Sequence, residues 1–377
     1  MKPFPFITVR GEPLERGRQY GEQARERICK GIGHYKAQVA RYALSSDDIA
    51  SLTRDYLPIV ERFEPAFVEE MRGIAEGSGT TFEDILLLNA RTEILKLAEK
   101  PALRESLTAS RQVPDGCTAV IVMPEATATG RLIHAQNWDW KAECAETGVV
   151  LKVEREDGPD LLTFTEAGAL ARTGLNASGM AITGNYLESD RDYREVGVPL
   201  ALIRRKALES DNLALAMRTI YATRKSASNN MIVSHAGGIA INFECAPDET
   251  FQVHPENGLL VHANHWVSQA ALAKLVDRGV ANMPSTLFRD LRARDLLRPK
   301  VGRITPADVR TALLDDFQTP YSLCQPERPN TAGIITATVA MIIMEPELGT
   351  MQITPLPSRG TAPSYYSLRA NEIRLAS

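Results

Sequence analysis

The feature that most constrains the fold of this 377-residue chain is a change of hydrophobic pattern near residue 116. Before it, apolar side chains recur every three or four positions, as in the stripe from Tyr20 to Tyr42, which predicts a long amphipathic helix. From Cys117 onward, short runs of β-forming residues are separated by turn residues. Helices and strands therefore come in blocks. This favours stacked antiparallel sheets with helices outside them, an α+β fold with αββα layers, over a doubly wound parallel sheet.

The boundaries of the expected elements follow from caps, prolines and turn residues. Helix starts are indicated at Ser45–Asp48, at Pro65 and at the capping-box spacing of Thr80–Glu83, whereas residues 97–115 predict a loop. Further helices are expected at 199–210, 213–224, 285–297 and 305–317. Strands are expected at 118–123, 132–138, 149–154, 161–165, 171–175, 180–185, 231–234, 239–244, 250–254, 259–262, 336–344 and 351–355.

Composition and charge exclude several classes of function. The net charge of -4 and a pI near 6.0 give no electrostatic reason to expect nucleic acid or an anionic membrane as partner. No apolar run approaches the roughly 18 residues of a membrane-spanning helix. Five cysteines without CxxC pairs indicate a reducing compartment, so a cytoplasmic location is expected. Cys29, Cys245 and Cys324 are expected to be buried and inert.

The Gly116-Cys117 bond has a distinctive chemical position, because it lies where the polar loop becomes an apolar strand. Glycine allows the chain to bend toward the thiol, and attack by Cys117 on the Gly116 carbonyl would convert the amide into a thioester that water can hydrolyse. The product would carry an α-amino group with a pKa of about 7.7–8, which suits a general base near neutral pH. A Gly-Cys pair alone is common, however, and by itself favours a buried structural cysteine over a catalytic one.

Several motifs in order resemble one family. They are Leu88–Glu93, Asp115–Ala119, Ala135–Trp140, Phe164–Gly168, Gly174–Ala181 and Val261–His265. Together they resemble the acyl-CoA:6-aminopenicillanic acid acyltransferase family, the isopenicillin-N acyltransferase-like branch (peptidase C45) of the N-terminal-nucleophile hydrolases. The resemblance implies a four-layer αββα sandwich and a precursor that cuts itself between Gly116 and Cys117. It implies a helical chain, 1–116, and a catalytic chain, 117–377.

The resemblance also implies roles for three residues. Cys117 would be the nucleophile both of self-cleavage and of the enzymatic reaction. Asn264 matches an asparagine whose side-chain amide stabilises the oxyanion; the alternative is a strand-end asparagine that caps a turn. Asp139 matches an acidic residue that acts near the nucleophile, chiefly in processing, and the alternative is a turn aspartate between two tryptophans.

Three further residues are candidates for substrate binding: Ser228, Trp138 and His262. For Ser228, the neighbouring Asn229 and Asn230 are equally polar alternatives. The pair of His262 and His265 lacks the spacing and the acidic or cysteine neighbours of a metal site. We therefore expect no metal, and two hydrogen-bonded histidines around Asn264.

A buried ion pair of Arg91 with Glu166 is expected to lock the helical part onto the sheets, and Glu244 is expected to be structural as well. The stretch 331–335 lacks the arginine that the penicillin-making members use for substrate binding. A substrate other than the penicillin nucleus is therefore expected.

The expected activity is hydrolysis of a small N-acyl or peptide-like linear amide through an acyl-thioester on Cys117. The alternative at the same site is an N-acyltransferase with acyl-CoA as co-substrate, and no other cofactor is expected. An alternative of another class is an unprocessed homologue that binds a ligand without catalysis, and a conventional Cys-His protease is a third. The expected partner is a small-molecule amide substrate. The two cleaved chains are expected to associate with each other, and a homo-oligomer is possible.

Overall fold

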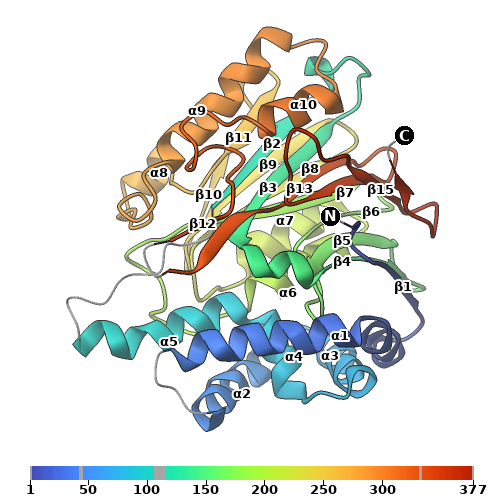
Figure 1. Ribbon diagram of the computed structural model, residues 1–377, viewed down its shortest axis with the longest axis vertical. Coiled ribbons are helices and arrows are strands. Elements are labelled where there is room, and N and C mark those ends of the chain that lie inside the picture. The colour runs from blue at the N-terminus through green and yellow to red at the C-terminus, as the bar shows by residue number, and fades with distance from the viewer. Residues whose placement is uncertain (1, 42–45, 106–115, 331–332, 376–377) are drawn as a thin grey trace.

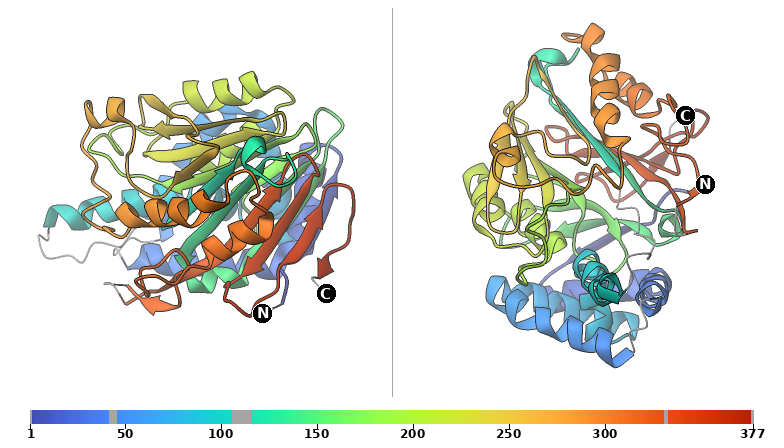
Figure 2. Two further views of the ribbon diagram at one scale, coloured as in Figure 1. Left: turned by 90° about the horizontal axis from the view of Figure 1, so that it is seen from above. Right: turned by 90° about the vertical axis from the view of Figure 1, so that its left-hand side faces the viewer.

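The chain folds into four layers, with helices on the two outer faces of a pair of stacked sheets (Figures 1 and 2). The computed structural model describes residues 2–41, 46–105, 116–330 and 333–375. The helices of the first hundred residues form one outer layer, and α9 (Thr286–Leu297) and α10 (Pro306–Leu313) cover the opposite face. The expected αββα layering is thus confirmed.

The first sheet has the strand order β1-β4-β5-β6-β7-β8-β9-β10. All neighbours pair antiparallel except β1 and β4, which are parallel. Its strands are β1 Phe6–Arg10, β4 Gly148–Glu154, β5 Leu161–Glu166, β6 Thr173–Asn176, β7 Met180–Tyr186, β8 Asn229–His235, β9 Ile239–Cys245 and β10 Thr250–Val253.

The second sheet has the order β11-β2-β3-β13-β14-β15-β16, with β12 paired to β13, and is antiparallel throughout. Its strands are β2 Cys117–Val122, β3 Ile133–Lys141, β11 Leu259–His262, β12 Arg328–Pro329, β13 Ile335–Glu345, β14 Thr350–Pro355, β15 Ser364–Ser367 and β16 Arg374–Leu375. Two of its central strands, β2 and β3, carry the candidate site residues Cys117 and Asp139.

The other helices pack mainly on the first sheet. They are α1 Pro13–Ala40, α2 Ser46–Phe63, α3 Pro65–Ser78, α4 Phe82–Asn89, α5 Arg91–Glu105, α6 Leu200–Leu208 and α7 Leu213–Ala222, with the short α8 Gln269–Leu272 elsewhere. One apolar cluster joins α1–α7 to the outer face of this sheet, and a second joins α9 and α10 to the other. Alternation along β2 points Cys117, Ala119 and Ile121 between the sheets and Val120 and Val122 toward α9 and α10.

The structure corrects the expected elements at several points. The polar stretch expected as a loop from residue 97 continues α5 to Glu105, because Leu95 and Ala98 bury against the helical cluster and favour continuation of the helix. The remainder of that stretch, 106–115, lies outside the described residues. The cap of α4 is Thr81 rather than Thr80, since its side chain accepts from the backbone nitrogen of Asp84. Strands β1, β12, β15 and β16 were not expected.

The expected helical stripe is confirmed from Tyr20 to Val39, all of whose members are buried in α1, while Tyr42 lies outside the described residues. The expected segment 1–116 is not purely helical, because β1 joins the first sheet beside β4. Cys29 is exposed rather than buried, and Cys324 is half-buried. Among the described residues, no helix has the length and apolarity needed to cross a membrane.

Candidate active site

Strand register brings together the residues around Cys117, the first residue of β2. β2 pairs antiparallel with β3, so that Cys117 lies opposite Trp138 and the next step places Gly116 opposite Asp139. On its other side β2 pairs with β11, where His262 lies opposite Ala119. Continued for two more residues, the same register places Asn264 beside Cys117. Backbone pairing therefore delivers a carboxyl and an amide side chain to the two sides of one peptide bond.

Asn264 contacts the nitrogen of that bond. The backbone N–H of Cys117 donates to Asn264 Oδ1 at 2.8 Å, and Asn264 Nδ2 donates to the carbonyl oxygen of Tyr186 at 2.9 Å. The side chain is 2 % exposed. The side chain expected to stabilise an oxyanion thus lies beside Cys117, with its oxygen toward the Cys117 nitrogen. Its role toward an oxyanion stays a prediction.

Asp139 lies beside the carbonyl of the same bond. Its backbone N–H donates to Gly116 O at 2.8 Å, and its carboxyl accepts from Thr338 Oγ1 at 2.6 Å and from Gln325 Nε2 at 2.9 Å. Burial raises the pKa of Asp139 to about 7, and the nearby positive charge of Arg289 opposes that rise. Near neutral pH this carboxyl is therefore able to give or to accept a proton.

Close approach of the Asp139 carboxyl explains why residue 116 is a glycine. A Cβ atom added to Gly116 would lie 2.7 Å from Asp139 Oδ2 and 3.1 Å from Gln325 Nε2. The sequence predicted that glycine is needed here for its backbone freedom. The structure shows a steric need, because any larger residue would displace the carboxyl from the Gly116-Cys117 bond.

Arg289 was not expected from the sequence. It lies on α9, is fully buried, and donates from Nη1 to Cys117 O and to Thr118 Oγ1, both at 2.8 Å. Its Nη2 donates to Asn264 Oδ1 at 2.8 Å, which orients the amide. A signal existed in the sequence: Arg289 shares the buried helical face of Ala293 and Leu297, where a charged residue is out of place.

Arg172 was also missed. It lies in the turn before β6, 7 % exposed, and its Nη2 is 3.6 Å from Cys117 Sγ. The Arg172 guanidinium also lies over the ring of Trp138, 4.2 Å from the ring centroid. A cation at this distance from sulfur favours the thiolate, the form of cysteine that acts as a nucleophile. No local pattern in the sequence marked this turn residue.

The three candidate substrate-binding residues have well-defined surroundings. Trp138 is fully buried between the sheets, against Phe164 and beneath Arg172. Ser228 donates from Oγ to Asp192 Oδ1 at 2.5 Å and lies 2.8 Å from Ser189 Oγ. These contacts give both residues structural roles, and substrate binding by them stays a prediction.

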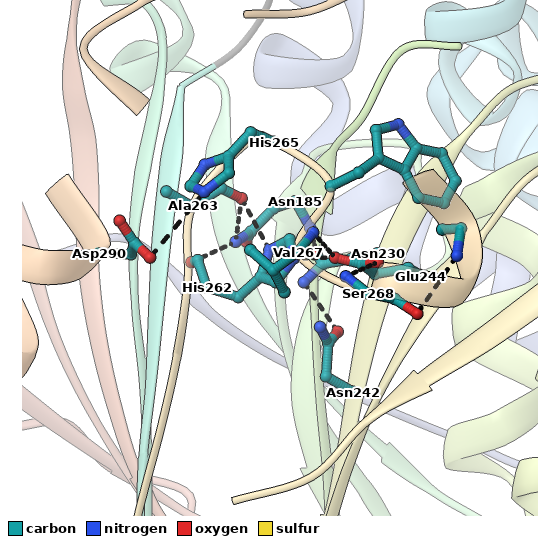
Figure 3. Close-up of polar contacts among 12 residues, drawn as sticks. Asn185, Asn230, Asn242, Glu244, His262, Ala263, His265, Val267, Ser268 and Asp290 are labelled. Carbon is teal, nitrogen blue, oxygen red and sulfur yellow. Dashed lines mark hydrogen bonds and ion pairs between the residues drawn. The ribbon is translucent and has the colours of Figure 1, made fainter. Parts of the chain in front are cut away.

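Both ring nitrogens of His262 are engaged by the protein. Nε2 lies 2.7 Å from Glu244 Oε1, and Nδ1 lies 3.0 Å from the carbonyl oxygen of Ala263. Figure 3 shows His262 and Glu244 within a network of polar side chains that includes Asn185, Asn230 and Asn242. Glu244 also accepts from the backbone nitrogens of Val267 and Ser268, as its expected structural role requires. Substrate binding by His262 stays a prediction.

The second histidine is held in the same region. His265 Nδ1 lies 3.0 Å from Thr286 Oγ1, and burial lowers the pKa of His265. The expected pair of hydrogen-bonded histidines is thus what the structure contains. Within the described ranges, no three or more His, Cys, Asp or Glu side chains are grouped to hold a metal ion.

The expected ion pair between the helical part and the sheets is present. Arg91 Nε lies 2.6 Å from Glu166 Oε2, and both side chains are buried. Tyr35 of α1 donates to the other oxygen of Glu166 at 2.7 Å. Residues before and after Gly116 are therefore joined by buried polar contacts as well as by apolar packing.

The two stacked sheets between outer helical layers have the αββα fold of the N-terminal-nucleophile hydrolases, and Cys117 is the first residue of a central strand. The chain belongs to the acyl-coenzyme A:6-aminopenicillanic acid acyl-transferase family, whose model matches residues 126–355. It is also 29% identical over 261 residues to the 40 kDa form of acyl-coenzyme A:6-aminopenicillanic-acid-acyltransferase from Emericella nidulans, covering 69% of this chain and 68% of that protein. The family resemblance inferred from the motifs is thereby confirmed.

Solved structures with a similar arrangement include a variant of conjugated bile acid hydrolase from Clostridium perfringens, with a TM-score of 0.48, 11% identity, and coverage of 69% of this chain and 96% of that one. Another is penicillin V acylase from Agrobacterium tumefaciens, with a TM-score of 0.43, 15% identity, and coverage of 68% and 92%. Likeness at this level supports no conclusion about the substrate of this chain.

Proposed function

We propose that this chain is a precursor that cuts its own Gly116-Cys117 bond and then uses Cys117 to cleave a small linear amide. The observation that carries the proposal is that both ends of this peptide bond are held: Gly116 O by the backbone N–H of Asp139 and the Cys117 nitrogen by Asn264. A carbonyl that already accepts a hydrogen bond is ready to carry the negative charge of a tetrahedral intermediate.

In self-cleavage, Cys117 Sγ bonds to the carbonyl carbon of Gly116, whose oxygen becomes an oxyanion held by the Asp139 N–H. The C–N bond then breaks, and the thiol proton passes to the leaving nitrogen. The Asp139 carboxyl is a suitable carrier of this proton, because its pKa is about 7. Water hydrolyses the resulting thioester. The products are a carboxylate on Gly116 and an α-amino group on Cys117, which remains hydrogen-bonded to Asn264 Oδ1.

In the enzymatic reaction, the α-amino group of Cys117 takes the proton of the thiol, and the sulfur attacks the substrate carbonyl. The positive charge of Arg172 beside the sulfur favours its anionic form. The second hydrogen of Asn264 Nδ2, which is not used toward Tyr186, is the donor that we assign to the oxyanion. The amine leaves with the proton, and water releases the acyl group from the thioester.

The second candidate is acyl transfer at the same cysteine, with acyl-CoA as donor and an amine in place of water as acceptor. It is favoured by the similarity to the Emericella nidulans protein, which is named as an acyl-coenzyme A:6-aminopenicillanic-acid-acyltransferase. Neither reaction calls for a further cofactor. Because no disulfide joins any two of the five cysteines, we also propose a reducing, cytoplasmic location.

The intact mass under denaturing conditions tests the proposal. Wild-type protein should give two chains, 1–116 and 117–377, in place of one of 41.4 kDa. Cys117→Ala should give one uncut chain without amidase activity. Cys29→Ala, which changes an exposed cysteine of α1, is the matched control and should process normally. Two fragments from the Cys117→Ala protein would refute self-cleavage by this thiol.

A further inference from the structure

A small polar cavity adjoins the candidate active site. It lies between α5, α6 and the turn before β6, and its volume is about 20 Å³, which is room for one or two atoms of water size. Three arginines and two glutamates line it: Arg91, Arg172, Arg204, Glu93 and Glu166. Arg172 connects this cavity with the nucleophile, because its guanidinium also lies 3.6 Å from Cys117 Sγ.

Both glutamates of the cavity are already engaged. Glu166 pairs with Arg91 at 2.6 Å and accepts from Tyr35. Glu93 accepts from the backbone nitrogen of Leu200 at 2.8 Å, at the start of α6. Neither carboxylate forms an ion pair with Arg204, so the positive charge at the α6 side of the cavity is not balanced by direct contact.

Arg204 is the unusual member of the group. Its side chain is 8 % exposed, yet it forms no hydrogen bond or ion pair with any part of the chain that the structure describes. Burial, together with the guanidinium groups of Arg172 and Arg91, lowers the pKa of Arg204 to about 9. The group remains charged at neutral pH, and a buried charge without a partner in the protein costs free energy.

The protein makes room for this guanidinium. A Cβ added to Gly184, within β7, would lie 2.4 Å from Arg204 Nη1. Glycine inside a strand weakens the strand. A glycine that nevertheless makes space for the Arg204 guanidinium therefore indicates that this charge has a function. The anion that it fits is small, since the cavity holds the two oxygens of a carboxylate but not a phosphate group.

We infer that Arg204 binds a carboxylate of the substrate, so that the natural substrate is a linear amide with a carboxylate on its acyl or its amine part. This inference rests on the proposed function, because it places the carboxylate next to Cys117. Guanidinium and carboxylate form two parallel hydrogen bonds, which also orient the amide. The cavity is built from both sides of the Gly116-Cys117 bond, so it requires that the two cleaved chains remain together.

Matched substrate pairs test this inference and distinguish the two positions of the carboxylate. One pair is glutaryl-p-nitroanilide and its terminal carboxamide, which places the carboxylate on the acyl part. The other is hexanoylglycine and hexanoylglycinamide, which places it on the amine part. Wild-type protein should prefer the carboxylate in one pair. Arg204→Met should raise KM for that carboxylate by about 10- to 100-fold, while KM for the carboxamide changes little.

Arg204→Lys should restore part of the preference, because it returns the charge without the bidentate geometry. Arg224→Met, at an exposed arginine paired with Glu195, is the control and should behave as wild type. The mass of each variant shows whether it has processed. A processed Arg204→Met protein that keeps the preference, or a processed wild type that shows no preference for the carboxylate in either pair, would overturn the inference.

Failure of the proposed function would leave the cavity testable by binding alone. If the protein neither processes itself nor hydrolyses any of the four amides, its thermal unfolding is measured with glutarate and with glutaramide. A rise in Tm with glutarate only, lost in Arg204→Met and kept in Arg224→Met, supports the carboxylate site. An equal effect of the two compounds, or none from either, overturns it.

Discussion

At the scale of single residues, the space around Gly116 is the feature that bears most directly on the proposed self-cleavage. Gly116→Ala would drive a methyl group against the Asp139 carboxyl, which lies 2.7 Å from the added atom. We expect self-cleavage to be at least about tenfold slower, because displacing the carboxyl should raise the activation free energy by roughly 1.4 kcal/mol. The time course of two-chain product by mass measures it. Gly360→Ala, where an added Cβ has open space, should process at the wild-type rate.

The Asp139 carboxyl predicts a dependence of stability on pH. Because burial raises its pKa to about 7 in the folded state, folding favours the protonated form, and stability is lost as pH rises through that value. The comparison is made in an uncut Cys117→Ala background, with and without Asp139→Asn. Between pH 5 and 8, the protein that keeps Asp139 should lose on the order of 2–3 kcal/mol more unfolding free energy than the Asp139→Asn protein. Urea denaturation at the two pH values measures the difference.

A parallel pH dependence of the two proteins would contradict the raised pKa of Asp139. His134 also titrates abnormally, because burial between Ser234 and Thr183 lowers its pKa to about 3. Its effect has the opposite sign: stability is lost as pH falls below about 6.5. Since both proteins retain His134, their difference isolates the contribution of residue 139.

At the scale of elements, α1 and α3 pack closely enough to exclude side chains between them. A Cβ on Gly17 would lie 2.1 Å from the carbonyl oxygen of Glu70, and one on Gly73 would lie 2.0 Å from that of Leu14. The same helix pair buries Arg16 against Glu70, which also binds Arg205 of α6. Glycines thus set the separation at which this buried ionic contact forms.

Gly17→Ala should therefore destabilise the protein by about 1–3 kcal/mol, because the two helices must move apart. Gly33→Ala lies in the same helix at an exposed position with nothing within 4 Å, and should stabilise it by about 0.5–1 kcal/mol. Urea denaturation of both variants in the uncut background measures the contrast. Equal effects of the two substitutions would show that close helix approach is not limiting.

At the scale of the whole molecule, the segments before and after the Gly116-Cys117 bond pack together in one fold. β1 completes the first sheet beside β4, and one apolar cluster includes residues of α1–α5 together with residues of that sheet. Neither part can bury its apolar surface without the other. We therefore propose that cleavage leaves one particle of two chains.

Two-chain association predicts how unfolding depends on concentration. The urea midpoint of the cleaved protein should rise with protein concentration, because unfolding releases two chains, whereas that of the uncut Cys117→Ala precursor should not change. Tryptophan fluorescence over a hundredfold range of concentration is a sufficient measurement. A constant midpoint for fully cleaved protein would mean that the chains do not separate on unfolding.

Much of the architecture was readable from the sequence, because local periodicity reports which faces are buried. The stripe from Tyr20 to Val39, the twelve expected strands and the block order of helices and strands all correspond to observed elements. The missed strands are short or lie at the edge of a sheet: β12 and β16 have two residues each, β15 has four, and β1 has partners only from β4. β1 and β15 do alternate in burial, but a run of four or five residues is too short to identify a strand without its partner.

The sequence alone determined the family, the layering, and the place of Cys117 near the start of one strand and of Asn264 just after another, because motifs and alternation are local properties of the chain. Only the tertiary structure decided which charges surround the sulfur. Arg172 is 55 positions from Cys117 and Arg289 is 172 positions away, and nothing in either local sequence points to this cysteine. Their role arises when two sheets and α9 bring them to one point, and electrostatic interactions depend on distance in space rather than along the chain.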